Sequence, residues 1–143
     1  MEEKRVKQVI VVRKDLNMRK GKMIAQGSHA SIAAIMEKVF GPREERQNAF
    51  PDAAWIDYAR EFKLDPAERA WYLGNFRKIC CYVESEAALL EVEAAAKALG
   101  LRCHLIEDRG LTEFNGVPTK TCLAIGPHWD DDVDPVTKHL PLL

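Results

Sequence analysis

The sequence predicts a single α/β domain in which helices cover both faces of a parallel or mixed sheet. Short apolar runs alternate with amphipathic helical stretches along the chain. Helices that separate successive strands favour parallel pairing, with helices packed on the two faces of the sheet. The chain has 143 residues, of which 47% are apolar and 30% charged. This length and composition suit one globular domain with a core that needs no crosslinks.

The first strand and the first helix are predicted from residues 7–40. Residues 7–13 (KQVIVVR) are a short β-branched run flanked by charge, which is typical of a central strand buried on both faces. After a loop at residues 14–21, a helix is expected from Lys22 to about Phe40, where Gly41-Pro42 would end it. Its apolar side is expected to contain Ile32, Ile35, Met36 and Val39.

Two further helices are predicted before the second strand. Residues 53–62 have a helical pattern. A third helix should run from Pro66 to Leu73, because Asp65 is a good N-cap and proline is favoured at the first helical position. Gly74 would end it, and residues 78–83 (KICCYV) would form the second strand.

The second half of the chain predicts one helix, two strands and a short tail. Ser85 caps a helix that is expected to turn five residues inward and to end at Gly100, namely Leu89, Leu90, Val92, Ala96 and Leu99. Strands are expected at residues 103–106 and 121–125, and they could pair antiparallel because they are close in sequence. Gly126-Pro127 is expected to break the last strand, before a tail that closes with about one helical turn.

Charge and cysteine content limit the kind of protein. Residues 1–22 hold eight basic and three acidic residues, a net charge of +5, whereas the remainder carries −6. This basic start could guide a ligand that bears phosphates, or it could be a solvated edge. The four cysteines have no metal-ligand spacing and lie in apolar runs, as expected of small core residues in a reduced cytosolic protein. The sequence suggests no secretory signal, membrane span, metal or organic cofactor.

Three polar residues mark one stripe of the first helix. Lys22, Gln26 and His29 stand at i, i+4 and i+7, and small alanines surround them. Taken singly, the glutamine could be a surface residue and the histidine a satisfied core residue. Together at this spacing they are equally compatible with a ligand-facing stripe.

A second polar cluster begins at the end of the third strand. Asp108 opens the loop DRGLTEFNGVPTKT, and a carboxylate at a strand end in an α/β protein often faces a ligand crevice. Thr112, Thr119 and Thr121 could hold a hydroxyl-rich ligand. Alternatively, Asp108 caps its own turn. The acidic run at residues 130–134 lacks the glycine and glutamate of a calcium loop and is interpreted as a solvated turn. No covalent nucleophile motif is present, which favours direct attack by water.

Three stretches together resemble the archaeal/eukaryotic-type (type 2) peptidyl-tRNA hydrolases. They are VIVVRKDLNMRKGKMIAQGSHA, the segment from GNFRKICCYV to AAAKALGL, and LIEDRGLTEF followed by TKTCLAIGP. The resemblance covers nearly the whole chain apart from about residues 41–70. It implies a three-layer α/β/α fold with a four-stranded mixed sheet, from which the segment at about 41–70 departs as a longer helical insertion. It also implies hydrolysis of the ester between a peptide, or an N-blocked amino acid, and the 3′ end of tRNA, which serves ribosome rescue.

The resemblance also implies roles for individual residues. The family's active-site lysine matches Lys22, its helix glutamine and histidine match Gln26 and His29, and its loop aspartate and threonine match Asp108 and Thr112. Lys22 would stabilise the oxyanion and Asp108 would orient water. Seven further residues are expected to bind tRNA: Arg13, Lys14, Arg19, Lys20, Arg109, Thr119 and Thr121.

The Asp108 loop departs from the family pattern. Arg109 and Leu111 stand where the family has alanine and arginine, and Glu113 replaces the glutamine after the threonine. An alternative prediction is therefore a family member without hydrolytic activity that serves as an RNA-binding or protein-adaptor module. Its partner surface would be residues 41–70, with Phe50, Trp55, Tyr58 and Phe62. A homodimer is also compatible with the sequence.

Overall fold

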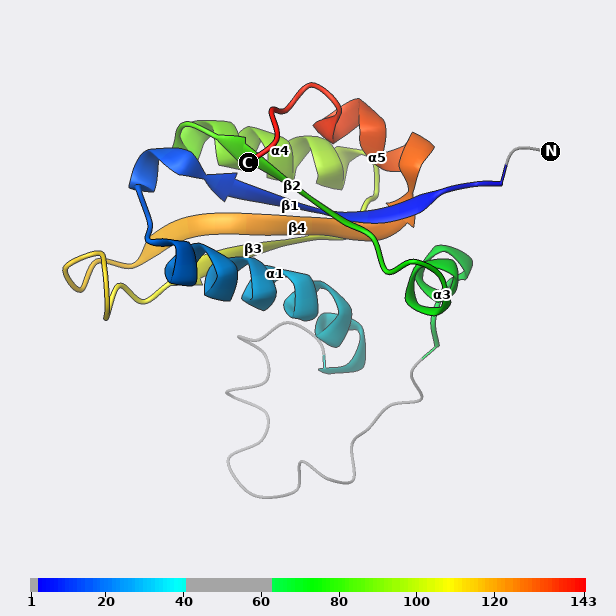
Figure 1. Ribbon diagram of the computed structural model, residues 1–143, viewed down its shortest axis with the longest axis horizontal. Coiled ribbons are helices and arrows are strands. Elements are labelled where there is room, and N and C mark those ends of the chain that lie inside the picture. The colour runs from blue at the N-terminus through cyan, green and yellow to red at the C-terminus, as the bar shows by residue number, and fades with distance from the viewer. Residues whose placement is uncertain (1–2, 41–62) are drawn as a thin grey trace, which may run out of the picture.

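The computed structural model describes residues 3–40 and 63–143, which contain four strands and four α-helices (Figure 1). In chain order these are β1 (Val6–Arg13), the short 3-10 helix η1 (Lys14–Leu16), α1 (Lys20–Phe40), α3 (Pro66–Leu73), β2 (Lys78–Val83), α4 (Glu86–Ala98), β3 (Cys103–Asp108), β4 (Thr119–Trp129) and α5 (Asp130–Thr137). The element order predicted outside residues 41–62 is confirmed. The helix predicted at 53–62 lies outside the described residues.

The four strands form one mixed sheet in the order β2-β1-β4-β3. β1 pairs parallel with β2 and antiparallel with β4, and β3 pairs antiparallel with β4. In β1, for example, Ile10 lies between Cys80 and Ala124. The prediction of a central first strand is therefore confirmed, as is the antiparallel closing pair.

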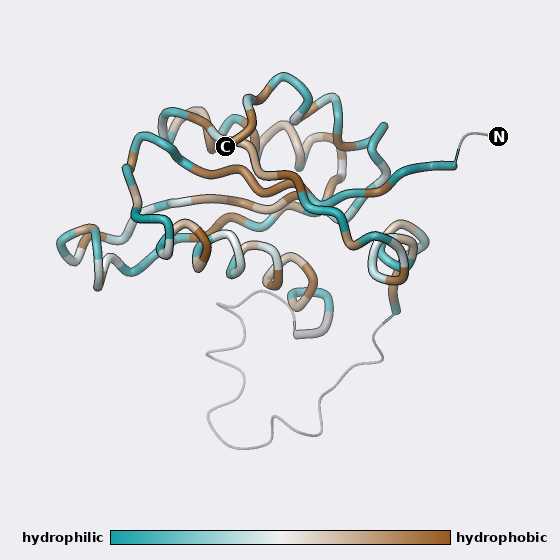
Figure 2. Tube along the Cα trace, viewed as in Figure 1, coloured by the Kyte–Doolittle hydropathy of each residue, from teal (hydrophilic) through white to brown (hydrophobic). Residues whose placement is uncertain are grey.

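Helices lie on both faces of the sheet (Figure 1). On one face α4 and α5 pack against Val9, Val11 and Leu123, with Leu89 and Val133 from the helices. On the other face α1 packs through Ala30 and Ala34 against β1 and β4. Hydrophobic residues follow the strands, whereas the N-terminal stretch and the loop after β3 are hydrophilic (Figure 2). These packed faces position the start of α1 beside the end of β3.

Both predicted helix caps are present. Asp65 accepts a hydrogen bond from the backbone N–H of Glu68, and Glu68 accepts one from the backbone N–H of Asp65, which makes a capping box. Ser85 accepts a hydrogen bond from the N–H of Ala88 at the start of α4. Such caps satisfy backbone donors that the first helical turn leaves unpaired.

The prediction for the apolar side of α1 is wrong in part. Ile32 is 60% exposed and Met36 is 36% exposed, so neither is a core residue. The buried face consists instead of small residues such as Ala30 and Ala34, which let the helix lie close to the sheet. Ile32 and Met36 then project from a flank of the helix. Leu99, at 57% exposed, is likewise wrong as an inward residue because it follows the last turn of α4.

The prediction that Gly126-Pro127 breaks the last strand is also wrong. β4 continues to Trp129, and the register with β1 shifts between Lys7 and Val9. Such a bulge accommodates a proline that lacks an N–H donor. The buried side-chain amide of Gln8 donates to the Gly126 carbonyl at 3.3 Å, so this carbonyl has a hydrogen-bond partner at the bulge.

The acidic run is a helix start rather than a solvated turn. Asp130, Asp131 and Asp132 form the first turn of α5, where the helix dipole favours negative charge. Asp130 pairs with Arg77 at 2.5 Å. Within residues 3–40 and 63–143, none of the helices is long and apolar enough to cross a membrane.

The cysteine prediction holds for only part of the set. Cys81 and Cys122 are buried and Cys103 is half-buried, but Cys80 is exposed on the α1 side of β2. β2 is an edge strand, and α1 does not extend over this part of it.

Candidate active site

The start of α1 and the end of β3 bring a lysine and an aspartate together. Lys22 Nζ lies 2.9 Å from Asp108 Oδ1 and donates a second hydrogen bond to Thr112 Oγ1 at 3.0 Å. The two charged side chains are only 14% and 16% exposed. Lys22 Nζ also lies 5.6 Å from the centre of the Phe114 ring. The cluster therefore contains a partly desolvated ion pair with a hydroxyl beside it.

A buried amide continues this cluster beneath the surface. Gln26, which is 2% exposed, donates from Nε2 to Asp108 Oδ1 at 3.1 Å. The fully buried Thr121 hydroxyl donates to Gln26 Oε1 at 2.6 Å. Because Thr121 occupies the amide oxygen, the amide nitrogen is left facing Asp108. The chain of bonds runs from β4 through α1 to β3.

The loop backbone holds the second carboxylate oxygen. The N–H of Gly110 donates to Asp108 Oδ2 at 2.9 Å. Gly110 has φ +78°, and a Cβ at this position would lie 2.3 Å from the Val117 carbonyl oxygen. Only glycine fits this backbone approach. Asp108 therefore both caps its own turn and faces Lys22, so the two interpretations of this residue are compatible.

The environment keeps Asp108 ionised. Burial alone would raise the pKa of Asp108, but the hydrogen bonds from Lys22, Gly110 and Gln26, together with the charge of Lys22, lower the pKa below its ordinary value. A carboxylate with a lowered pKa is a weak base that accepts hydrogen bonds well. Such a group can orient a water molecule more readily than it can remove a proton.

His29 does not join this cluster. It is exposed, and no hydrogen bond in the described part of the chain connects it to Lys22, Gln26 or Asp108. The sequence spacing thus brings together two of the three polar residues of the stripe.

The residues predicted to bind tRNA fall into exposed and occupied groups. Arg19, Lys20 and Arg109 are exposed, and the Arg19 side chain is 91% exposed, with Glu113 at 4.0 Å. Arg13 is mostly buried and pairs with Asp15 at 2.7 Å and with Glu86 at 3.5 Å.

The other three predicted tRNA contacts already have intramolecular partners. Lys14 lies over the Tyr82 ring at 4.3 Å. Thr119 donates to the Val117 carbonyl, and Thr121 is buried below Gln26. Lys14 is nevertheless exposed, so among the residues predicted to bind tRNA the positive charge that faces solvent is that of Lys14, Arg19, Lys20 and Arg109.

Sequence reasoning missed one participant, the Phe114 ring. The Gly110 N–H is the donor of the turn that Asp108 was expected to cap, and an aspartate two residues before a glycine is the pattern of an Asx turn. Phe114 has no comparable signal. No group of three or more potential metal ligands occurs among the residues that the structure describes.

Comparisons with known proteins agree on one family. The family model "Peptidyl-tRNA hydrolase PTH2" matches residues 6–143. A peptidyl-tRNA hydrolase of Thermococcus onnurineus is 37% identical over 141 residues, covering 97% of this chain and 98% of that protein. One of Methanocaldococcus jannaschii is 36% identical over 138 residues, covering 96% of this chain and all of that protein.

A eukaryotic relative is similar over only part of its length. The probable peptidyl-tRNA hydrolase 2 of Dictyostelium discoideum is 36% identical over 136 residues. The match covers 95% of this chain and 54% of that protein.

Proposed function

The chain belongs to the peptidyl-tRNA hydrolase PTH2 family and hydrolyses peptidyl-tRNA, and we propose that the cluster around Lys22 and Asp108 cleaves the ester. Water adds to the ester carbonyl, the bond from that carbon to the ribose oxygen breaks, and a peptide carboxylate and a tRNA hydroxyl are released. The observation that carries this proposal is the 2.9 Å contact between Lys22 Nζ and Asp108 Oδ1 at a partly desolvated position.

Lys22 is the group that stabilises charge on the ester oxygen. An ammonium has three donors, and the described contacts of Lys22 use two of them, to Asp108 and Thr112. A carbonyl oxygen that approaches this nitrogen gains a charged hydrogen bond as it becomes an oxyanion. Loss of one such donor typically costs a factor of about 10²–10³ in rate.

Asp108 is the group that positions the attacking water. Its lowered pKa keeps it ionised at neutral pH, so it accepts a hydrogen bond from water and holds it beside the carbonyl carbon. As the water attacks, its proton moves toward the departing ribose oxygen or solvent, and Asp108 stabilises the positive charge that develops on the water.

Gln26, Thr112 and Thr121 are positioning residues in this proposal. Thr121 fixes the amide orientation of Gln26, Gln26 donates to Asp108, and Thr112 accepts from Lys22. His29 is exposed two turns beyond Lys22, about 10 Å along the helix. At that distance we assign it to contact with the substrate outside the reacting ester.

The tRNA backbone would lie over the exposed positive charge. Arg19, Lys20 and Arg109 are exposed near the ion pair and supply that charge. Arg13 and Lys14 have intramolecular partners, so their contribution is a longer-range field. Phosphate contacts of this kind weaken steeply as salt concentration rises.

We also propose that the protein acts in the cytoplasm during ribosome rescue, because translation produces peptidyl-tRNA there. A homodimer, with which the sequence is compatible, is a further proposal. A protein partner bound through residues 41–70 remains a second proposal, and the aromatic residues of that segment lie outside the described residues.

The adaptor alternative without hydrolysis receives no support from the comparisons.

The test is hydrolysis of N-blocked aminoacyl-tRNA by Lys22→Ala. We expect turnover to fall by at least about 10² while circular dichroism stays close to that of the parent protein. The matched control is Lys97→Ala, which removes an exposed lysine of α4 that pairs with Glu93 within its own helix. Hydrolysis by Lys22→Ala at the rate of Lys97→Ala would refute the assignment.

A further inference from the structure

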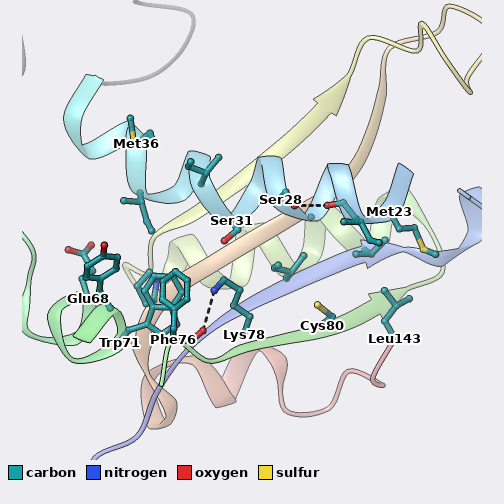
Figure 3. A pocket seen from close by; sticks show the side chains of 18 of the residues that line it. Met23, Ser28, Ser31, Met36, Glu68, Trp71, Phe76, Lys78, Cys80 and Leu143 are labelled. Atoms are coloured by element: carbon teal, nitrogen blue, oxygen red, sulfur yellow. Dashed lines mark hydrogen bonds between the residues drawn. The ribbon is translucent and has the colours of Figure 1, made fainter. Parts of the chain in front are cut away.

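An apolar groove lies on the flank of α1 that faces away from the cluster of Lys22 and Asp108. A groove of about 1040 Å³ separates this flank from α3 and from strands β1 and β2 (Figure 3). Met23 lies at one end of the groove, near Cys80 and Leu143, whereas Trp71 and Phe76 lie at the other (Figure 3). Its volume is at the upper limit of ordinary small-ligand sites, about 300–1,000 Å³, so it holds several side chains.

The surface of this groove is apolar and open to solvent. Ile24 is 70% exposed, Ile32 is 60% exposed and Tyr72 is 63% exposed, and all three line it. Contiguous exposed apolar side chains of this kind are a feature of binding grooves.

Most polar groups of the groove have partners within the protein, whereas Lys20 at its near end is exposed. The Ser28 hydroxyl donates to the Ile24 carbonyl at 2.8 Å, and the Ser31 hydroxyl donates to Gln8 Oε1 at 2.6 Å. The Glu68 carboxylate pairs with Lys38 and with Arg102. The groove therefore offers few hydrogen bonds to a ribose or a base edge. Apart from Lys20 and Lys78, its lining suits apolar side chains.

The groove begins in the turn of α1 that holds Lys22. Lys20, Met23 and Ile24 line its near end, and Lys22 and Met23 are consecutive residues whose Cα atoms are about 3.8 Å apart. The helix between the cluster and the groove is about 10–12 Å across with its side chains. An extended peptide spans about 3.3–3.6 Å per residue, so about three residues reach from the ester at Lys22 to the groove.

We propose that this groove binds apolar side chains of the peptide that is esterified to tRNA, starting about four residues from the ester. The inference rests on the proposed function, because it requires the ester to lie at Lys22. The tRNA would then approach over Arg19 and Arg109, and the peptide would leave across the first turn of α1.

The test compares two substrates and one double variant. Ile24→Gln/Ile32→Gln keeps good helix formers on α1 and removes two exposed apolar side chains. We expect KM for a tRNA that carries an octapeptide of leucine and alanine to rise at least about 10-fold, because each buried leucine-sized side chain contributes that much. N-acetyl-aminoacyl-tRNA should be hydrolysed with unchanged KM and kcat. Leu99→Gln, at a leucine exposed beside α4, is the control.

A second measurement uses Cys80, which lines the groove and is exposed. A bulky maleimide on Cys80 should raise KM for the octapeptide substrate and leave the N-acetyl substrate unchanged, and Cys80→Ser should abolish this effect. Equal KM for the octapeptide substrate in parent and double variant would overturn the proposal, as would equal losses for both substrates accompanied by a change in oligomeric state. Failure of the proposed function is a separate result, since Lys22→Ala would then retain turnover on both substrates.

Discussion

The two flanks of α1 differ in how their side chains are used. On the flank toward β3, Lys22 and Gln26 are bonded to Asp108, and a buried threonine fixes the amide. On the flank toward β2, Ile24 and Ile32 lie open to solvent beside an apolar groove. One helix therefore presents a preorganised polar cluster on one side and an apolar surface on the other. Chemistry requires fixed donors, whereas binding of varied peptide sequences requires only apolar area.

The largest fall in hydrolysis rate is expected from Asp108→Asn, which changes the polar flank alone. The substitution keeps the size of the side chain and removes the charge that orients water and pairs with Lys22. We expect kcat to fall by about 10²–10⁴ for both short and long substrates. Steady-state hydrolysis of both substrates measures it. A fall of less than about threefold would remove Asp108 from the chemistry.

A smaller loss is expected from Thr121→Val. It leaves Gln26 Oε1 buried without its donor, which costs about 1–3 kcal/mol of unfolding free energy, and it frees the amide to turn away from Asp108. We expect kcat to fall by about 10-fold, on the basis of one lost hydrogen bond to a charged group. Denaturant unfolding and kinetics together measure both changes. Thr119→Val is the control, because that hydroxyl donates to the Val117 carbonyl within its own loop. Equal behaviour of the two variants would contradict the positioning role.

The acid limb of the pH profile is a further test of the polar flank. The pKa of Asp108 is below its ordinary value of 3.8, so its carboxylate should stay ionised as pH falls to about 5. The rate of hydrolysis should therefore not change over that range. The stability that this lowered pKa contributes is present above the ordinary pKa and is lost as pH falls through the folded one. Gln26→Leu removes one of the hydrogen bonds that lower the pKa of Asp108, so the acid limb of the pH profile should move to higher pH. A limb at the same pH in both proteins would contradict this account.

The smallest effect concerns thiol reactivity, which reports on the open flank. Cys80 should react first with a maleimide, since it is exposed in the groove. Burial raises the pKa of Cys103 to about 12 and that of Cys122 to about 11, so these thiols should react far more slowly. Mass spectrometry of the labelled protein measures the order. Modification of Cys122 before Cys80 would show that the sheet is less tightly covered than described.

Local sequence patterns predicted most of the helices and strands, because caps and buried strands depend on residues that are neighbours in the sequence. The Asp65-Pro66 cap, the Ser85 cap and the apolar run of β1 each depend on neighbouring residues, and each is present. The apolar side of α1 was mispredicted because helix periodicity does not reveal how far a neighbouring sheet extends. β2 is the edge strand, and no helix or strand within residues 3–40 and 63–143 buries Ile32 and Met36.

The site was predictable in its parts but not in its connections. Spacing indicated Lys22 and Gln26, and the strand end indicated Asp108. The role of Thr121 could not be predicted, because the bond to Gln26 depends on how α1 crosses β4. For the same reason His29 was grouped with residues from which its exposed position separates it.

The most direct test of the contrast between the two flanks is a ratio of kcat/KM for the octapeptidyl-tRNA and N-acetyl-aminoacyl-tRNA substrates. Lys22→Ala should lower both values together by at least about 10² and leave the ratio unchanged. Ile24→Gln/Ile32→Gln should lower the ratio at least about 10-fold. A ratio that changes with Lys22→Ala, or that does not change with the double variant, would contradict the division between chemistry on one flank and peptide binding on the other.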